Sequence, residues 1–192
     1  AIPKTSTTSA SPKKGLGIGT KHDGWDKKLI DLRCKWFYSW ITGTEKAIPE
    51  GIEFVPMVFG RWDIEGSAKK TGDFAMKTGV PHILGFNEPD QKEQSNMSVE
   101  KALDAWPLLM ETGLRLGSPA CVHPDKDWMK EFMAGVEERK LRVDFICMHS
   151  YTGPNAESFV KRVESVHSMF GRPIWITEFA VGDWEAKSPE TN

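Results

Sequence analysis

The sequence has little of several features that define other classes of protein. Its 25 Lys and Arg residues nearly balance its 27 Asp and Glu residues, for a formal net charge of −2, so it presents no strong basic field to a nucleic acid or an anionic membrane. It has no apolar run of the about 18 residues that a membrane span needs. No Gly-rich phosphate loop follows its first predicted strand, which argues against a dinucleotide-binding fold. We therefore expect no nucleic-acid partner and no membrane contact.

Cysteine is also scarce, with only Cys34, Cys121 and Cys147 in the chain. An odd number excludes complete internal pairing, and the spacing fits no zinc site. Two alternatives stay open: three buried free thiols, or one disulfide and one free thiol. A Cys121–Cys147 bridge is within reach if these residues lie on neighbouring parallel strands with their side chains on one face. We expect neither a metal nor another cofactor.

Tryptophan, by contrast, is abundant, with eight Trp against two Tyr in 192 residues. Large flat side chains suit a core, and they also stack on the apolar faces of sugar rings. Residues 1–14 are rich in Ser, Thr, Pro and Lys and lack periodicity, which predicts a disordered leader or linker left after processing. Such a leader is typical of secreted proteins. We therefore predict an extracellular protein with one folded domain over residues 15–192.

Within that domain, short β-branched or aromatic runs alternate with amphipathic stretches of helix length. The predicted strands are Gly15–Thr20, Lys35–Ile41, Ile52–Gly60, His82–Asn87, Leu114–Val122, Val143–Tyr151 and Pro173–Ala180. The predicted helices are Asp23–Leu32, Ser67–Thr78, Val99–Thr112, Asp125–Lys140 and Glu157–Met169. Ser98 is placed to cap a helix at Lys101, and Gly79, Gly113 and Gly171 stand where helices should stop.

Strands that alternate with helices predict an α/β fold with a parallel sheet. An open doubly wound sheet and a TIM-type (β/α)8 barrel both fit. In a barrel, functional residues gather at the carboxyl ends of several strands. Polar and aromatic residues follow most of the predicted strands here, so the pattern favours the barrel.

Two glutamates occupy such strand ends. Glu88 follows the fourth predicted strand, and Glu178 lies near the end of the seventh. Cleavage of a glycosidic bond needs two facing carboxyls, one to protonate the leaving oxygen and one to attack the anomeric carbon or to activate water. Strands 4 and 7 of a barrel lie across its mouth from each other. The sequence therefore predicts a glycosidase in which Glu88 holds a proton while Glu178 is ionised.

Longer motifs around these residues carry a more specific resemblance. They are Leu84–Asp90, Gly117–Ala120, His149–Tyr151 and Ile174–Ala180, in this order on consecutive predicted strands. Together they resemble glycoside hydrolase family 128, retaining enzymes of the 4/7 barrel superfamily that act on β-1,3-glucans. The resemblance implies a β-1,3-glucan polysaccharide or oligosaccharide as partner, and it implies roles for individual residues by matched position. Another β-glycan as substrate, and a barrel that binds glucan without hydrolysis, stay open as alternatives.

The resemblance implies that Glu88 is the general acid/base and Glu178 the nucleophile, about 5–5.5 Å apart as in retaining enzymes. Asn87 would bind the 2-hydroxyl of the sugar beside the scissile bond, Tyr151 would orient Glu178, and His149 belongs to the same substrate-binding group.

The candidates for sugar stacking are Trp36, Tyr38, Trp40, Trp62 and Trp184. Of these, Trp40, Trp62 and Trp184 lie at strand ends and are the expected platform, with Trp36 and Tyr38 as the next candidates. Trp25, Trp106 and Trp128 lie on predicted helices and are expected to serve in packing. Strand alternation predicts that Trp175 faces the helices and not the pocket.

The predicted barrel lacks one element. A TIM barrel has eight strands and typically about 250 residues, whereas only seven strands are predicted here. An unclosed barrel would expose strand edges and an apolar seam. Three explanations stay open: a second polypeptide supplies the missing C-terminal part, the sequence is part of a longer chain, or the domain is truncated.

Overall fold

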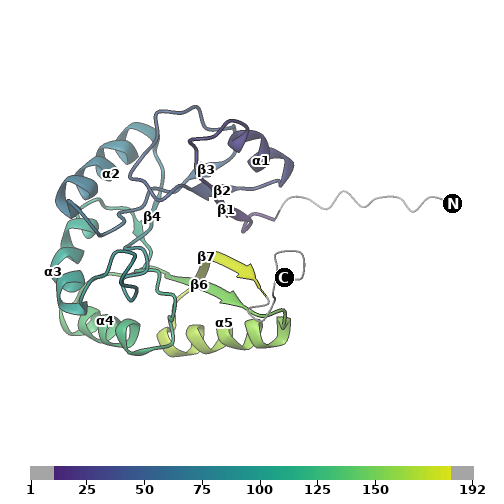
Figure 1. Cartoon of the computed structure of the whole chain (residues 1–192). Helices are drawn as coiled ribbons and strands as arrows, with labels where there is room; N and C mark the ends of the chain where they lie inside the picture. The colour runs from purple at the N-terminus through teal and green to yellow at the C-terminus, as the bar shows by residue number, and fades with distance from the viewer. Residues whose placement is uncertain (1–10, 183–192) are drawn as a thin grey trace.

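The computed structural model describes residues 11–182, and the structural statements below concern these residues. Strands and helices alternate along the chain, and the helices surround the strands on the outer side (Figure 1). The strands are β1 (Gly15–Gly17), β2 (Trp36–Tyr38), β3 (Glu53–Phe54), β4 (His82–Ile83), β5 (Arg115–Leu116), β6 (Ile146–Thr152) and β7 (Ile174–Val181). The helices are α1 (Trp25–Asp31), α2 (Ile64–Thr78), α3 (Val99–Met110), α4 (Asp127–Glu138) and α5 (Ala156–Phe170).

The strands pair in sequence order, and every pairing is parallel. Ladders join β1 to β2, β2 to β3, β4 to β5, and β6 to β7. Isolated bridges continue the same order, with Met57 paired to Leu84 between β3 and β4, and Gly117 paired to Phe145 between β5 and β6. β1 and β7 are also in contact. The predicted alternating α/β fold with parallel strands is therefore confirmed.

Each predicted strand and helix overlaps an observed element, although α2 begins at Ile64, three residues before the predicted start, and several ladders are shorter than the apolar runs. The run predicted over Ile52–Gly60 forms a ladder only at Glu53–Phe54, and its pairing resumes at the single bridge of Met57. Two residues that follow strands have left-handed backbones, Trp40 with φ 55° and Glu88 with φ 42°. Regular pairing cannot continue through such a conformation.

The helix signals in the sequence match the structure at most termini. The Ser98 hydroxyl accepts a hydrogen bond of 3.2 Å from the Lys101 N–H, as expected for the cap of α3. Gly79 and Gly171 end α2 and α5 with φ of 75° and 63°, values that glycine adopts without strain. Gly113 also has a positive φ, but it lies beyond Glu111, which caps α3.

Three apolar clusters pack against the strands: an outer one at α3 and α4, an inner one, and a third one of Trp25, Leu29, Cys34, Phe37 and Phe54. The outer cluster packs strands against α3 and α4 and includes Trp106 and Phe132, both fully buried. The inner cluster lies on the opposite side and consists of Tyr38, Val55, Met57, Leu84, Ala120, Phe145 and Cys147, with Trp36, Trp40, Phe59 and Trp175 packed against it. Trp25 and Trp106 are buried and Trp128 is partly buried, so the packing role predicted for these three is confirmed.

The prediction for Trp175 is wrong, because its ring belongs to the inner cluster and not to the helical side. It packs 4.6 Å from the Phe145 ring and 5.0 Å from the Trp36 ring, centroid to centroid. The register shifts at this point: Met148 pairs with Ile176, but His149 pairs with Glu178, which leaves Thr177 as an extra residue. A bulge of this kind reverses the alternation, so Trp175 and Glu178 point to the same side.

All three cysteines are free and buried. Cys121 packs in the outer cluster, whereas Cys147 belongs to the inner cluster. Side chains on opposite faces of a sheet cannot form a disulfide between neighbouring strands. Of the two alternatives that the sequence left open, the structure supports three free thiols.

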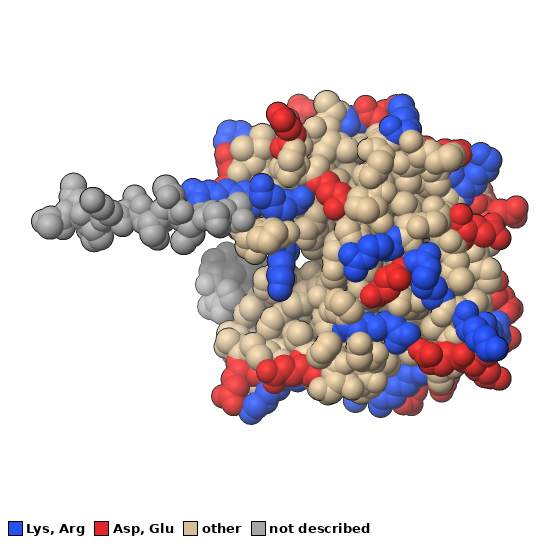
Figure 2. Space-filling model, turned by 180° about the vertical axis from the view of Figure 1, so that it is seen from behind, with Lys and Arg blue, Asp and Glu red and all other residues tan. Residues whose placement is uncertain are grey.

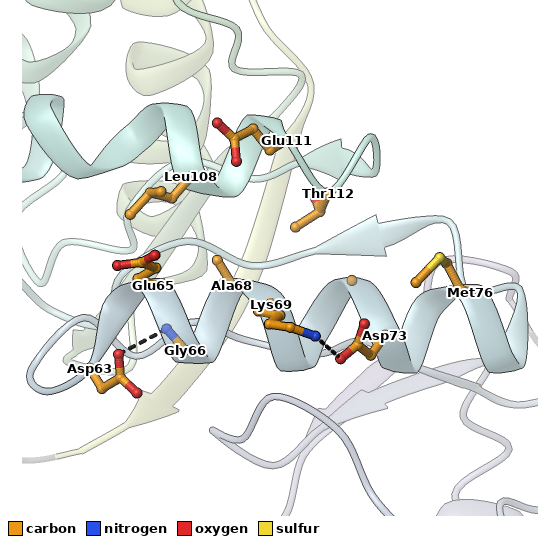
Figure 3. Close-up of a pocket in the computed structure, with 11 residues that line it drawn as sticks. Asp63, Glu65, Gly66, Ala68, Lys69, Asp73, Met76, Leu108, Glu111 and Thr112 are labelled. Carbon is orange, nitrogen blue, oxygen red and sulfur yellow. Dashed lines mark hydrogen bonds and ion pairs between the residues drawn. The ribbon is translucent and has the colours of Figure 1, made fainter.

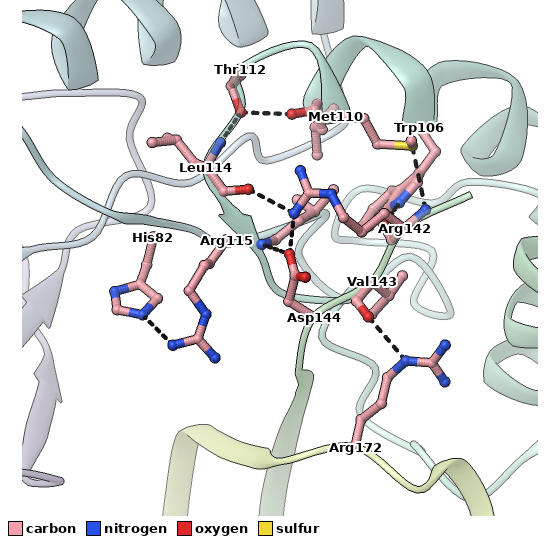
Figure 4. Close-up of polar contacts among 12 residues, drawn as sticks. His82, Trp106, Met110, Thr112, Leu114, Arg115, Arg142, Val143, Asp144 and Arg172 are labelled. Carbon is pink, nitrogen blue, oxygen red and sulfur yellow. Dashed lines mark hydrogen bonds and ion pairs between the residues drawn. The ribbon is translucent and has the colours of Figure 1, made fainter. Parts of the chain in front are cut away.

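The amino ends of β4 to β7 are connected by arginine side chains (Figure 4). Arg142 donates to the Leu114 carbonyl at 2.9 Å and pairs with Asp144, whose carboxylate accepts from the Leu116 N–H at 2.7 Å. Arg172 donates to the Val143 carbonyl at 2.9 Å. These contacts satisfy backbone groups that lie outside the strand ladders.

Within residues 11–182, none of the helices combines the length and the apolar character needed to cross a bilayer. On the face shown in Figure 2, Lys and Arg are interspersed with Asp and Glu.

Candidate active site

The site forms where the carboxyl ends of β2, β4, β6 and β7 converge. Glu88 lies five residues after β4, and its N–H donates to the Ala120 carbonyl at 2.8 Å. Its side chain is 11% exposed, and its backbone φ of 42° is uncommon for a residue with a β-carbon. Backbone strain of this kind costs about 1–3 kcal/mol and is concentrated at functional sites. The conformation of Glu88 is therefore consistent with a functional role for this residue.

Glu178 lies in β7 and accepts three short hydrogen bonds. The Tyr38 hydroxyl and the Trp40 indole N–H donate to Glu178 Oε1 at 2.7 and 2.8 Å, and the Tyr151 hydroxyl donates to Oε2 at 2.6 Å. The three donors come from two neighbouring regions of the fold, the end of β2 and the end of β6. They fix the orientation of the carboxylate and stabilise its charge.

These contacts determine the protonation state of the cluster. Burial alone would raise the pKa of Glu178, but the neighbouring His149 and the donors Tyr151, Tyr38 and Trp40 lower it below its ordinary value. Burial raises the pKa of Tyr38 and of Tyr151, and contact with Glu178 raises both further. Glu178 is therefore held as a carboxylate while both phenols keep their protons.

His149 lies between the two glutamates. Its Nδ1 is 2.7 Å from Glu88 Oε1, and its Nε2 is 3.6 Å from Glu178 Oε1. The imidazole has no exposed surface, so it cannot reach a sugar in the way expected of a substrate-binding residue. One carboxyl oxygen of Glu88, one of Glu178 and one imidazole nitrogen lie within 4.8 Å of one another.

Asn87 precedes Glu88 and is buried, with two different environments at its amide. Its Nδ2 donates to Gln94 Oε1 at 3.3 Å, whereas its Oδ1 has no hydrogen-bond partner. A buried acceptor without a partner is costly, so this oxygen is available to accept from a hydroxyl. Gln94 holds the amide in place. Sequence reasoning missed it because nothing but its position in the loop after β4 distinguishes it.

Two further contacts that the sequence did not reveal fix that loop. The Asp90 carboxylate accepts from the Val122 and His123 N–H groups at 3.1 and 3.0 Å. Arg61 donates to the Glu93 carbonyl at 3.0 Å. The loop that carries Asn87 and Glu88 is thus connected to the segments that follow β5 and β3.

The aromatic residues expected to form one platform have different positions. Tyr38 is fully buried, so its ring offers no face to a sugar. Trp40 is partly buried and donates to Glu178. Trp36 packs among Tyr38 and Trp175, and its indole N–H donates to the Lys13 carbonyl at 3.1 Å.

Trp62 alone among these described residues is widely exposed, at 72%. Its ring stacks beside Phe59 with centroids 5.7 Å apart, and the Arg61 guanidinium lies 5.7 Å from its ring centroid. Trp184 lies outside the described residues.

A small cavity of about 210 Å³ opens beside Glu178. Its lining includes Gly15, Gly17, Trp36, Trp40, Tyr151 and Phe179. A larger groove of about 560 Å³ lies on the outer surface between α2 and α3 (Figure 3). Its polar groups are already engaged, since Asp63 caps the Gly66 N–H and Lys69 pairs with Asp73. The smaller cavity, which Glu178 lines, is therefore the better candidate for a ligand site.

Among the described residues, Glu88, His149 and Glu178 form the one group with the composition of a metal site. Both oxygens of Glu178 already accept hydrogen bonds, and Nδ1 of His149 is engaged with Glu88. This arrangement suits proton transfer and charge stabilisation, and we assign the group to that chemistry.

Comparison with known proteins agrees with this geometry. The sequence pattern of the glycosyl hydrolase catalytic core matches residues 15–192, so the chain belongs to that family of carbohydrate-cleaving proteins. Among solved structures, an endo-β-1,3-glucanase of glycoside hydrolase family 128, subgroup I, from Amycolatopsis mediterranei in complex with laminaritriose is 36% identical, with a TM-score of 0.82. The match covers 93% of this chain and 75% of that one. The chain is a member of glycoside hydrolase family 128, as its motifs predicted.

Two further relatives agree with this assignment. A subgroup II endo-β-1,3-glucanase from Sorangium cellulosum is 30% identical with a TM-score of 0.75, covering 91% of this chain and 76% of that one. The curated alkali-sensitive linkage protein 1 of Schizosaccharomyces pombe is 29% identical over 186 residues, which is 93% of this chain. The chain spans only 33% of the length of that curated relative.

Proposed function

We propose that the chain is an endo-acting β-1,3-glucanase that cleaves glucan with retention, by double displacement. Glu88 is the general acid/base and Glu178 the nucleophile. The observation that carries this proposal is that one oxygen of Glu88 and one oxygen of Glu178 lie within 4.8 Å of each other. That separation is close to the about 5–5.5 Å of retaining enzymes and well short of the about 6.5–9.5 Å that leaves room for an attacking water.

The surroundings of each carboxyl support its proposed role. Three donors and a lowered pKa keep Glu178 ionised for attack on the anomeric carbon. Glu88 accepts no comparable set of donors among the described residues, and it lies beside Asn87, whose free Oδ1 is placed to meet a sugar hydroxyl. Tyr38, Trp40 and Tyr151 act through Glu178 in this proposal, and the exposed Trp62 stacks on a more distant sugar.

The β-1,3-glucan substrate is the finer part of the proposal. It rests on the solved relatives, which are described as endo-β-1,3-glucanases, some of them in complex with laminari-oligosaccharides. The test is turnover of laminarin and of laminari-oligosaccharides, with cellulose and mannan as comparison substrates and product analysis to establish endo action. Turnover of cellulose or mannan alone would point to another β-glycan, and binding without turnover to a glucan-binding protein.

The stereochemical part has its own test. NMR of the first product formed should show the β-anomer before mutarotation, because two displacements at the anomeric carbon retain its configuration. An α-anomer as first product would contradict the nucleophile role of Glu178.

We also propose that the seven strands form an incomplete (β/α)8 barrel in which the free edge of β7 would take an eighth strand. Three observations support this: consecutive strands are parallel neighbours, β7 has a ladder only with β6, and Phe179 and Val181 on β7 are 64% and 62% exposed. An additional strand and helix, from the same or a second polypeptide, would cover this edge. The intact mass of the purified protein, with a search for a copurifying fragment, tests the proposal.

Secretion is part of the same proposal. It is supported by the Ser/Thr/Pro-rich residues 1–14 and by a substrate class of large extracellular polymers. Recovery of the protein from the culture medium of its source would test it.

A further inference from the structure

The Asp90 carboxylate, two residues after Glu88, accepts hydrogen bonds from two successive backbone groups. Its Oδ1 accepts from the Val122 N–H at 3.1 Å and its Oδ2 from the His123 N–H at 3.0 Å. Each oxygen thus has its own donor. Hydrogen bonds to an ionised acceptor are about twice as strong as those between neutral groups. Asp90 therefore attaches the loop after β4 firmly to the segment after β5.

A second attachment joins the same two segments at Glu88 itself. The Glu88 N–H donates to the Ala120 carbonyl at 2.8 Å, and Asn87 pairs with Ala120 in a parallel bridge. The backbone of Glu88 is therefore held on both sides by residues 120–123. That segment is fixed in turn to β6 by a bridge at Cys121.

The backbone between the two attachments has an uncommon conformation. Glu88 has a φ of 42°, which costs free energy for a residue with a β-carbon and persists only where the surroundings enforce it. Pro89 follows, and its ring restricts φ to about −65°, so the chain has little freedom between Glu88 and Asp90. Displacement of Asp90 would therefore displace Glu88 as well.

The two glutamates differ in what fixes their positions. Three side-chain donors orient the Glu178 carboxylate. Within residues 11–182, the Glu88 carboxyl has a single contact of this kind, with His149 Nδ1 at 2.7 Å. The position of Glu88 therefore depends mainly on its backbone, and so on the two attachments.

We propose that Asp90 is the positioning residue of the general acid/base, and that its two backbone hydrogen bonds hold Glu88 where it can reach the glycosidic oxygen. This proposal rests on the proposed function of the two glutamates. Catalysis depends steeply on position, because a misplacement of about 1 Å can lower a rate about 10²-fold. Asp90 acts through Glu88 and takes no part in the proton transfer.

A matched control lies at the other end of the strands. The Asp144 carboxylate also accepts from a backbone N–H at β5, that of Leu116, at 2.7 Å. It belongs to the amino ends of the strands, whereas Asp90 belongs to the carboxyl ends. Asp→Asn at either position keeps the shape of the side chain but replaces one acceptor oxygen by a donor and removes the charge.

The first test is amide hydrogen exchange followed by NMR, which requires no turnover. Rates are compared with the slowest amides of each protein, which report global unfolding. In Asp90→Asn the Glu88 N–H should exchange about 10-fold faster than in the parent, because the loop opens more easily. Asp90 does not bind this N–H, so the change would report movement at Glu88. The rate in Asp144→Asn should be parental, and an unchanged rate in Asp90→Asn would overturn the proposal.

The second test uses two leaving groups to separate acid catalysis from general activity. A laminari-oligosaccharide needs a proton from Glu88, because a sugar alkoxide is a poor leaving group. The dinitrophenyl β-glycoside of laminaribiose needs none. In its first displacement a Glu178 oxygen forms the bond to the anomeric carbon, the bond to the phenolic oxygen breaks, and the electron pair leaves on dinitrophenolate.

The expected result is a loss that depends on the leaving group. For Asp90→Ala, kcat/KM should fall about 10²-fold on the oligosaccharide and no more than about threefold on the dinitrophenyl glycoside. Asp90→Asn should show the same pattern to a smaller degree, and it replaces Asp90→Ala if that variant does not fold. Asp144→Asn should affect both substrates equally. Equal losses on both substrates for the Asp90 variants, or no loss, would reject the proposal.

The two tests separate this inference from the proposed function. Faster exchange at Glu88 in Asp90→Asn, with a parent that cleaves neither substrate, would contradict the glucanase proposal alone. If Glu88→Ala shows the dependence on the leaving group and the Asp90 variants do not, the inference alone is contradicted.

Discussion

The two ends of the parallel strands differ in how their polar groups are satisfied. At the amino ends, Arg142 and Arg172 donate to backbone carbonyls, Asp144 accepts from a backbone N–H, and Glu53 pairs with His82 at 2.8 Å. At the carboxyl ends and in the loops after them, the buried atoms that have no partner within residues 11–182 are Asn87 Oδ1, Ser95 Oγ, His149 Nε2, Ser150 Oγ and Thr177 Oγ1.

Positive φ does not separate the two ends, because Glu88 and Trp40 adopt it in the active-site region and Arg33 and Lys140 adopt it ahead of β2 and β6. Strained backbones and unpaired buried polar atoms lower the stability of the fold. Proteins retain them where the function of the site requires them. The comparison indicates that the carboxyl ends are arranged for a ligand and the amino ends for stability.

The largest expected effect comes from a Glu→Gln substitution at each end. Glu178→Gln should lower kcat by at least about 10³-fold while oligosaccharide binding is largely retained, because it removes the nucleophile and alters the ground state little. The matched control is Glu53→Gln at the amino ends, which should leave kcat within about twofold. Steady-state kinetics on laminarin and calorimetric binding of laminari-oligosaccharides measure both. Equal activity of Glu178→Gln and the parent would end the nucleophile assignment.

Removal of an amino-end arginine should have the opposite signature. Arg142→Met leaves the Leu114 carbonyl and the Asp144 carboxylate without their donor, and hydrogen bonds to charged groups contribute about 1.5–3 kcal/mol. We expect the free energy of unfolding in urea to fall by about that amount, with kcat unchanged well below Tm. Arg142→Lys, which keeps the charge, should lose less. A loss of kcat without a loss of stability would contradict the division between the two ends.

Removal of one donor to Glu178 should change the pH dependence of activity. Glu178 must be ionised to attack, so kcat/KM falls as the pH drops through its pKa, which the structure lowers. Tyr38→Phe removes one stabilising hydrogen bond, so the acidic limb should move to higher pH and kcat should fall about 10-fold, in line with about 1.5 kcal/mol for a hydrogen bond to a charge. An unchanged limb in a folded Tyr38→Phe protein would show that this hydroxyl does not stabilise the charge.

The same lowered pKa predicts a pH dependence of stability. A carboxyl with a lower pKa in the folded state stabilises the fold above its unfolded pKa, about 4.3 for Glu. This contribution is lost as the pH falls below that value through the folded pKa. Urea unfolding across this range should therefore show a steeper loss of stability for the parent than for Glu178→Gln. Parallel curves would argue against the lowered pKa.

The smallest expected effect belongs to Trp62, which is 72% exposed. Trp62→Ala should weaken binding of laminari-oligosaccharides by about 1 kcal/mol, at the low end of the about 1–3 kcal/mol for stacking on aromatic rings, and should leave Tm nearly unchanged. The contrasting control is Trp128→Ala, because Trp128 packs against the outer cluster and donates to the Met97 carbonyl. It should lower stability and preserve affinity. If Trp62→Ala loses stability but not affinity, the platform lies elsewhere.

Much of the fold could be predicted from local patterns. Every predicted strand and helix overlaps an observed element, and the Ser98 cap and the Gly79 and Gly171 termini depend on interactions within a few residues. Strand alternation failed at Trp175, because the bulge at Thr177 arises from pairing with β6 and leaves no mark in the sequence of β7. The sequence also could not decide whether Cys121 and Cys147 form a disulfide, because the answer depends on which side of the strands Cys121 faces.

The sequence by itself determined the order of the elements, the family, and the two glutamates placed at the ends of strands, since motif residues and apolar periodicity are local properties of the chain. Only the tertiary structure decided what surrounds these carboxyls. Contacts between residues far apart in sequence place Tyr38 and Trp40 on Glu178, put His149 between the two glutamates and leave Trp62 in solvent. Protonation states and stacking surfaces depend on distance and burial, and these follow from how β2, β4, β6 and β7 come together in space.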